Sequence, residues 1–149
     1  MNNGMVQKIQ ERIIGLLPIE GQDRPGVLLA DNCSEISRLV AGWIKTLSET
    51  SHILILKGIN VCNTQKAHDI LAVTINNQVY IIDPTIWQFF PEAKSILVCV
   101  SENINVALDK IKEIYGGEWK ESEEFAQIDK DKEKEYLNII YKNIYENLT

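Results

Sequence analysis

Two runs of β-forming residues, separated by a pair of asparagines, constrain the fold more than any other part of this sequence. Residues 66–75 (KAHDILAVTI) and 78–83 (QVYIID) flank Asn76 and Asn77. Asparagine tolerates the positive φ angles that a two-residue hairpin turn requires, so we predict a tight antiparallel hairpin. Such a hairpin fixes which side chains share a face of the sheet, because side chains alternate along each strand.

This predicted register places a histidine beside an aspartate. If the two asparagines form the loop, His68 is a diagonal neighbour of Asp83 on the same face. If the loop begins one residue earlier, His68 and Asp83 lie directly opposite each other. Both two-residue loops bring the side chains within reach, whereas a three-residue loop would place them on opposite faces.

The remaining elements occur in blocks of one type. The predicted helices share apolar residues at helical spacing and comprise 5–17, 31–47, 103–117 and 130–148. The further predicted strands are the short apolar runs 52–58 and 95–100. Residues 18–31, rich in Gly and Pro, predict a loop. This order predicts an α+β fold in a single domain, 1–149, with N-terminal helices packed on a small antiparallel sheet and C-terminal helices after it.

Charge and composition exclude several classes of partner. The chain carries 21 acidic and 15 basic side chains, and its basic residues are scattered. A nucleic acid or an anionic membrane requires a positive footprint, so neither is an expected partner. No stretch reaches the ~18 apolar residues of a membrane span, and the N-terminus lacks the apolar core of a secretory signal. We therefore expect a cytoplasmic protein.

The cysteines and histidines do not form a pattern that is typical of a disulfide framework or a metal site. The three cysteines are an odd number, and the sequence has only two histidines and no CxxC or HExxH motif. We expect no metal, and with no visible cofactor motif we expect no cofactor. The oligomeric state is left open.

Cys33 begins a predicted helix directly behind Asp31 and Asn32, either of which is a natural N-cap. The unpaired amides at a helix N-terminus stabilise a thiolate, which is the reactive form of cysteine. Taken alone, this residue is better read as a small buried hydrophobe that fills space in the core. Together with His68 and Asp83 it fits an activated nucleophile, in which the imidazole carries the proton and the carboxylate orients the imidazole.

These segments resemble the core of papain-like and transglutaminase-like cysteine enzymes. The resemblance rests on NCSEISRLVAGWI, followed by AHDILAV and VYIIDPT, within residues 31–90. It implies Cys33 as nucleophile, His68 as general base and acid, and Asp83 as the residue that orients the imidazole. Related small domains include bacterial toxins and effectors that deamidate glutamine, cleave peptides or transfer acyl groups. The resemblance therefore also implies a protein or peptide substrate, and export as an effector without a classical signal peptide as an alternative location.

The sequence departs from the papain pattern at the expected oxyanion site. Papain itself has a glycine after its cysteine motif and a glutamine a few residues upstream, whereas here Ser34 follows the cysteine and the only upstream candidate is Gln22. Asn32, or the backbone amide of Cys33, is an alternative oxyanion donor. Trp87, just after the Asp-Pro turn, is a candidate wall for the substrate cleft, although such aromatics also pack the end of a sheet.

Two functions follow from these residues. The first is a cysteine-dependent hydrolase or acyltransferase that acts on an amide, as a peptidase or a protein-glutamine deamidase. The second is a non-catalytic protein-binding module on the same fold, of the adaptor or immunity type, in which Cys33, His68 and Asp83 are present but idle.

Overall fold

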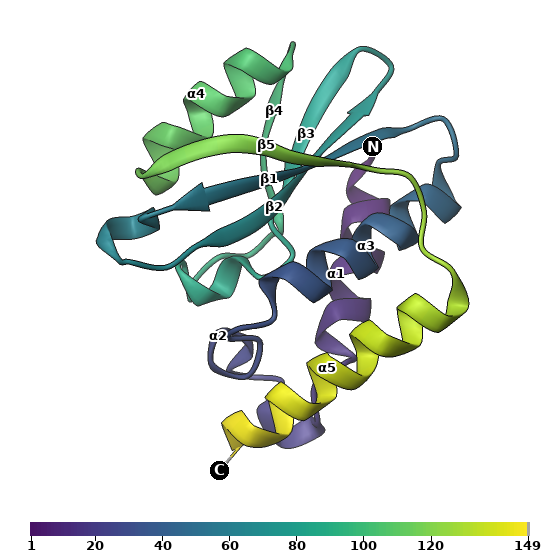
Figure 1. Ribbon diagram of the computed structural model, residues 1–149, viewed down its shortest axis with the longest axis vertical. Helices are drawn as coiled ribbons and strands as arrows, with labels where there is room; N and C mark the ends of the chain where they lie inside the picture. Colours follow the sequence, from purple (N-terminus) through teal and green to yellow (C-terminus); the bar gives the residue numbers. More distant parts are fainter. Residues whose placement is uncertain (149) are drawn as a thin grey trace.

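The computed structural model describes residues 1–148, and within them the chain forms five α-helices, three short 3-10 helices and one five-stranded antiparallel sheet (Figure 1). This confirms the predicted α+β class. The α-helices are α1 (Asn3–Ile14), α2 (Pro25–Leu28), α3 (Cys33–Leu47), α4 (Ile104–Tyr115) and α5 (Lys130–Leu148). The strands are β1 (His52–Ile59), β2 (His68–Ile75), β3 (Gln78–Ile82), β4 (Leu97–Ser101) and β5 (Glu118–Phe125), in the spatial order β4-β3-β2-β1-β5. The 3-10 helices are η1 (Ile19–Gly21), η2 (Val61–Asn63) and η3 (Ile86–Gln88).

The β2–β3 hairpin has the first of the two predicted registers. Ile75 pairs with Gln78, so Asn76 and Asn77 form the loop. Their φ angles are 51° and 64°, the left-handed values that a two-residue turn of this kind requires. The turn chemistry of two asparagines therefore sets the register of the whole hairpin.

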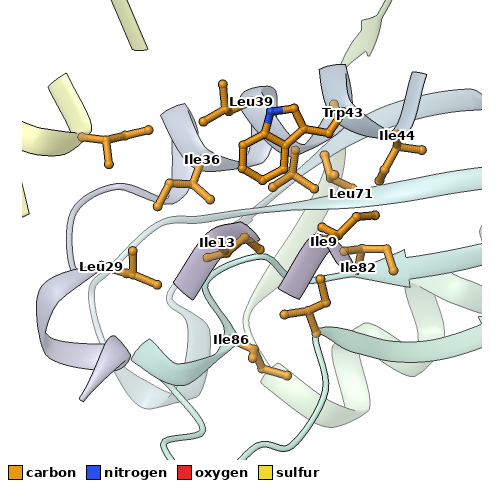
Figure 2. Packing of buried hydrophobic residues seen from close by; sticks show 14 of the residues in the cluster. Ile9, Ile13, Leu29, Ile36, Leu39, Trp43, Ile44, Leu71, Ile82 and Ile86 are labelled. Atoms are coloured by element: carbon orange, nitrogen blue, oxygen red, sulfur yellow. The ribbon is translucent and has the colours of Figure 1, made fainter. Parts of the chain in front are cut away.

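The two faces of the sheet are covered by different helices. Figure 1 shows α4 on one face and α1 and α3 on the other, with α5 packed against α3. On the α3 face, Ile36 and Ile44 of α3 and Leu71 of β2 enter one apolar layer with residues of α1 (Figure 2). On the α4 face, a smaller apolar cluster joins Ile111 of α4 to Ile70 of β2. Strict alternation along β2 thus sends adjacent residues into different clusters.

Helix α3 forms because its apolar residues recur at helical spacing, and all of this stripe except the terminal Leu47 is buried. Ile36, Leu39, Val40 and Ile44 have no exposed surface, and burying each such side chain stabilises the fold by about 1.5–3 kcal/mol. The predicted cap is only partly correct. Asn32 occupies the N-cap position, but its side chain makes no capping hydrogen bond to the helix.

Two predictions about elements require correction. Residues 18–31 are not simply a loop, because η1 and the single turn of α2 lie within them. Strand β5 was not predicted at all. Its sequence, EWKESEEF, is acidic and mostly exposed, so it lacks the apolar alternation that marks a strand. β5 is an edge strand held by its pairing with β1, and this pairing is invisible in the local sequence.

None of the helices within residues 1–148 has the length and apolar content that crossing a membrane demands.

Candidate active site

His68 and Asp83 form a fully buried pair, as the predicted register requires. His68 is the first residue of β2 and Asp83 follows the end of β3. The Nε2 atom of His68 lies 2.8 Å from Oδ2 of Asp83, and both side chains are 0% exposed. A charged pair that is this deeply buried requires further hydrogen bonds to satisfy the carboxylate.

Two further groups hold the Asp83 carboxylate. The backbone amide of Thr85 donates to Oδ1 at 3.1 Å, and the hydroxyl of Tyr115 donates to Oδ2 at 2.5 Å. Tyr115 is the last residue of α4 and is buried. The sequence analysis missed both contacts, and no local signal marks Tyr115, because it reaches Asp83 only when α4 packs on the sheet.

These contacts determine the protonation states in the site. Burial lowers the pKa of His68, but the charge and hydrogen bond of Asp83, together with Cys33, raise that pKa to about 10. Burial, followed by the charge of Asp83, raises the pKa of Tyr115. At neutral pH His68 is therefore an imidazolium and Tyr115 a neutral hydrogen-bond donor.

Cys33 lies at the first position of α3, is half-buried and is not in a disulfide. It is close enough to the imidazole to contribute to the raised pKa of His68. With Nε2 bonded to Asp83, the ring nitrogen left for the sulfur is Nδ1. This nitrogen is buried and has no hydrogen-bond partner of normal geometry within residues 1–148. The structure thus brings the three predicted residues together, with the thiol near enough to the imidazole to interact with it and the imidazole bonded to Asp83.

Aromatic rings enclose the imidazole. The Phe89 ring lies edge-on with its centroid 4.8 Å from that of His68, and the Trp119 ring lies 6.5 Å away. Trp119 comes from β5 and reaches His68 across Gly58 of β1, which pairs with both residues. A Cβ atom at Gly58 would lie 2.6 Å from the indole, so only glycine leaves room for this ring. The enclosure keeps the imidazolium away from bulk water.

The predicted oxyanion and substrate-wall residues, Gln22, Asn32 and Trp87, all make hydrogen bonds to groups outside the His68–Asp83 site. The Gln22 amide donates to the Leu17 carbonyl at 3.2 Å, and the indole N–H of Trp87 donates to the Ala93 carbonyl at 2.9 Å. Trp87 is also buried in the core on the α3 face, so it packs the end of the sheet.

Asn32 is fully buried and turned toward other parts of the chain. Its amide donates to the Ala30 carbonyl, and its oxygen accepts a hydrogen bond of 2.9 Å from Asn143 of α5. The backbone amide of Cys33 is the other predicted oxyanion donor. An oxyanion role for Gln22 or Asn32, and a substrate-wall role for Trp87, stay predictions.

Two surface cavities lie away from this site. One has a volume of about 700 Å³ between α3 and residues 126–133, and the other, of about 410 Å³, adjoins it along β5. Neither is lined by Cys33, His68 or Asp83. Within the part of the chain that the structure describes, no three His, Cys, Asp or Glu side chains gather to hold a metal ion.

Comparisons of this chain with protein-family models, curated proteins and solved structures find no match.

Proposed function

We propose that this protein is a cysteine-dependent hydrolase or acyltransferase of the papain-like or transglutaminase-like type, acting on an amide of a protein or peptide. Cys33 is the nucleophile, His68 the proton carrier and Asp83 the residue that orients His68. The observation that supports this most is the buried His68–Asp83 pair, 2.8 Å apart, beside a cysteine at a helix N-terminus. Buried titratable groups with strongly shifted pKa values and a specific charged partner cluster at functional sites.

The reaction proceeds through a thioester. Cys33 attacks as the thiolate, which is the reactive form of cysteine, and the imidazolium of His68 lies beside it at the first turn of α3. The thiolate attacks the amide carbonyl carbon, and the C–N bond breaks as the imidazolium gives its proton to the leaving nitrogen. Water, activated by the now neutral imidazole, then attacks the thioester and regenerates the thiolate. An amine in place of water gives acyl transfer, and a glutamine side chain as substrate gives ammonia and glutamate.

The test of the nucleophile is alkylation by iodoacetamide at pH 6, with each cysteine quantified by mass spectrometry. Cys62 and Cys99 serve as internal controls, because burial raises the pKa of both thiols. We expect Cys33 to be alkylated at least about tenfold faster than either control, since only the thiolate reacts. We expect the preference to be lost in His68→Gln. Equal, slow labelling of all three cysteines in the wild-type protein would contradict the proposal.

The test of the reaction uses an N-protected Gln-Gly dipeptide and a mixture of unstructured peptides. Release of ammonia indicates a deamidase, incorporation of added hydroxylamine indicates a transferase, and new peptide termini indicate a peptidase. Cys33→Ala is the matched control and must abolish each signal. If none of the three products appears although Cys33 is selectively alkylated, the substrate lies outside these classes of amide.

A second candidate is the non-catalytic protein-binding module. The observation in its favour is that His68 and Asp83 are fully buried and that the two cavities do not reach them. In such a module the pair would act as a buried polar element of the α4 face. Selective alkylation of Cys33 at pH 6 decides against this function, and equal labelling decides for it.

A further inference from the structure

Arg38 bridges Ser34 and Asp69, which follow the proposed catalytic residues Cys33 and His68 in the sequence. Its Nη1 donates to the hydroxyl of Ser34 at 2.7 Å and to the Ser34 carbonyl at 3.0 Å. The same nitrogen lies 3.1 Å from Oδ2 of Asp69. Ser34 follows Cys33 in α3, and Asp69 follows His68 in β2. One guanidinium therefore joins the first turn of α3, in which Cys33 lies, to the strand that carries the imidazole.

A second contact supports the same junction. The hydroxyl of Ser37, which is fully buried, donates to the backbone carbonyl of Asp69 at 3.1 Å. The Nε of Arg38 also lies 3.0 Å from Glu123 of β5. The first turns of α3 are thus tied to β2 by two side chains, and Arg38 extends the connection to the edge strand.

The Arg38–Asp69 pair is sheltered from water. The two side chains are 16% and 5% exposed, and Oδ1 of Asp69 is buried without a hydrogen-bond partner within residues 1–148. Burial lowers the pKa of Arg38, but the hydrogen bond and charge of Asp69 and the charge of Glu123 outweigh it, so the guanidinium stays charged. A planar guanidinium holds such partners in a fixed geometry, which a flexible ammonium does not.

We propose that Arg38 is a positioning residue that sets the separation between the sulfur of Cys33 and the imidazole of His68. This inference rests on the proposed function, because a separation between sulfur and imidazole affects reactivity only if the two groups act together. Arg38 does not reach the reacting atoms itself. It acts on the face opposite to the His68–Asp83 pair, since His68 and Asp69 alternate across the sheet.

The experiment measures the rate of Cys33 alkylation by iodoacetamide from pH 5.5 to pH 9.5 in Arg38→Met, Arg38→Lys and Ser34→Ala. Arg12→Met is the control, because Arg12 is an arginine in another helix whose guanidinium stacks on Trp43. At pH 6 the thiolate depends on a nearby imidazolium, whereas at pH 9.5 most thiols ionise unaided.

We expect Arg38→Met to slow alkylation at pH 6 by at least about tenfold, as misplacement by 1 Å costs up to about 100-fold. The rate at pH 9.5 should change little. Arg38→Lys should recover part of the loss, Ser34→Ala should lose less than Arg38→Met, and Arg12→Met should match the wild type. The His68 titration, followed by NMR, should change only slightly, because Asp83 raises the His68 pKa more than Cys33 does and still holds the ring.

Other outcomes overturn the inference. If Arg38→Met keeps its circular-dichroism spectrum and the wild-type pH profile of alkylation, Arg38 has only a structural role and the proposed function still stands. If wild-type Cys33 reacts no faster than Cys62 at pH 6, the function and the positioning role both fail. Should Arg38→Met not fold, Ser34→Ala and Ser37→Ala carry the test, and wild-type profiles in both refute the inference.

Discussion

Two adjacent residues, His68 and Asp69, form ion pairs on opposite faces of the sheet, and the two pairs differ in their burial and surroundings. On the α4 face, His68 pairs with Asp83, and neither side chain has any exposed surface. On the α3 face, Asp69 pairs with Arg38, whose other partner, Glu123, is 46% exposed. One pair is enclosed by aromatic rings, and the other leads outward to an acidic edge strand.

Under the proposed function, this difference separates a chemical role for His68 and Asp83 from a positioning role for Arg38. In the His68–Asp83 pair, a low local dielectric strengthens the attraction between the two groups. Asp83 therefore keeps the pKa of His68 well above its usual value. In the Arg38 network, solvent and salt screen the contact with the half-exposed Glu123, whereas the Arg38–Asp69 contact is sheltered, so we expect the network to act mainly by holding α3 and β2 in a fixed geometry. The comparison predicts that variants on the α4 face change protonation, whereas variants on the α3 face change placement.

The largest effect is expected for Asp83→Asn. Removing one partner of a buried ion pair costs about 3–5 kcal/mol, because the other charge is left without compensation. His68 should lose its imidazolium proton, since burial, the largest cause acting on its pKa, then lowers that pKa with only Cys33 opposing it. Urea unfolding and the NMR titration of the imidazole measure the two effects. An unchanged His68 pKa in the folded variant would show that Asp83 is not its main partner.

The pH dependence of stability is expected to follow the same pair. The pKa of His68 is raised from 6.5 to about 10, so the folded protein holds this proton more tightly than the unfolded chain. The added stability is fully present below pH 6.5 and is lost as the pH rises toward 10. Urea unfolding between pH 6.5 and 8.5 should show a decrease of about 1 kcal/mol per pH unit. Asp83→Asn is the control, and the slope should disappear in it.

A smaller effect is expected for Gly58→Ala. The new methyl group would lie 2.6 Å from the Trp119 ring, and such overpacking costs about 1–3 kcal/mol. The indole must move away from His68, which tryptophan fluorescence and the NMR shifts of the imidazole would detect. Gly42→Ala is the matched control, because its methyl group would make only ordinary contact with Ile128. Equal spectra for the two variants would mean that Trp119 does not depend on Gly58.

The smallest effect is expected for Glu123→Gln. An ion pair with one half-exposed partner contributes less than about 1 kcal/mol, and the contacts of Arg38 with Ser34 and Asp69 remain. Urea unfolding in low and high salt measures this contribution, which should be weaker at high salt. A loss as large as that of Asp83→Asn would contradict the distinction between the two faces.

Turn chemistry and side-chain periodicity were sufficient to predict where Cys33, His68 and Asp83 lie in their secondary-structure elements. Two asparagines set a two-residue turn, the turn set the register, and the alternation of side chains then put His68 and Asp83 on one face. The apolar stripe of α3 likewise placed Cys33 at a helix N-terminus. Each step depends on residues only a few positions apart, where turn geometry and periodicity dominate.

The sequence alone therefore determined the α+β class, the common face of His68 and Asp83, and the start of the helix that carries Cys33. Only the tertiary structure decided which groups surround them: Tyr115 on the carboxylate, Trp119 over the imidazole, Arg38 between α3 and β2, and Asn143 bound to the Asn32 side chain that was expected to cap α3. Tyr115 and Asp83 are 32 positions apart, and Asn143 and Asn32 are 111 apart. Contacts over such separations depend on how whole elements pack, and neither turn chemistry nor periodicity encodes that packing.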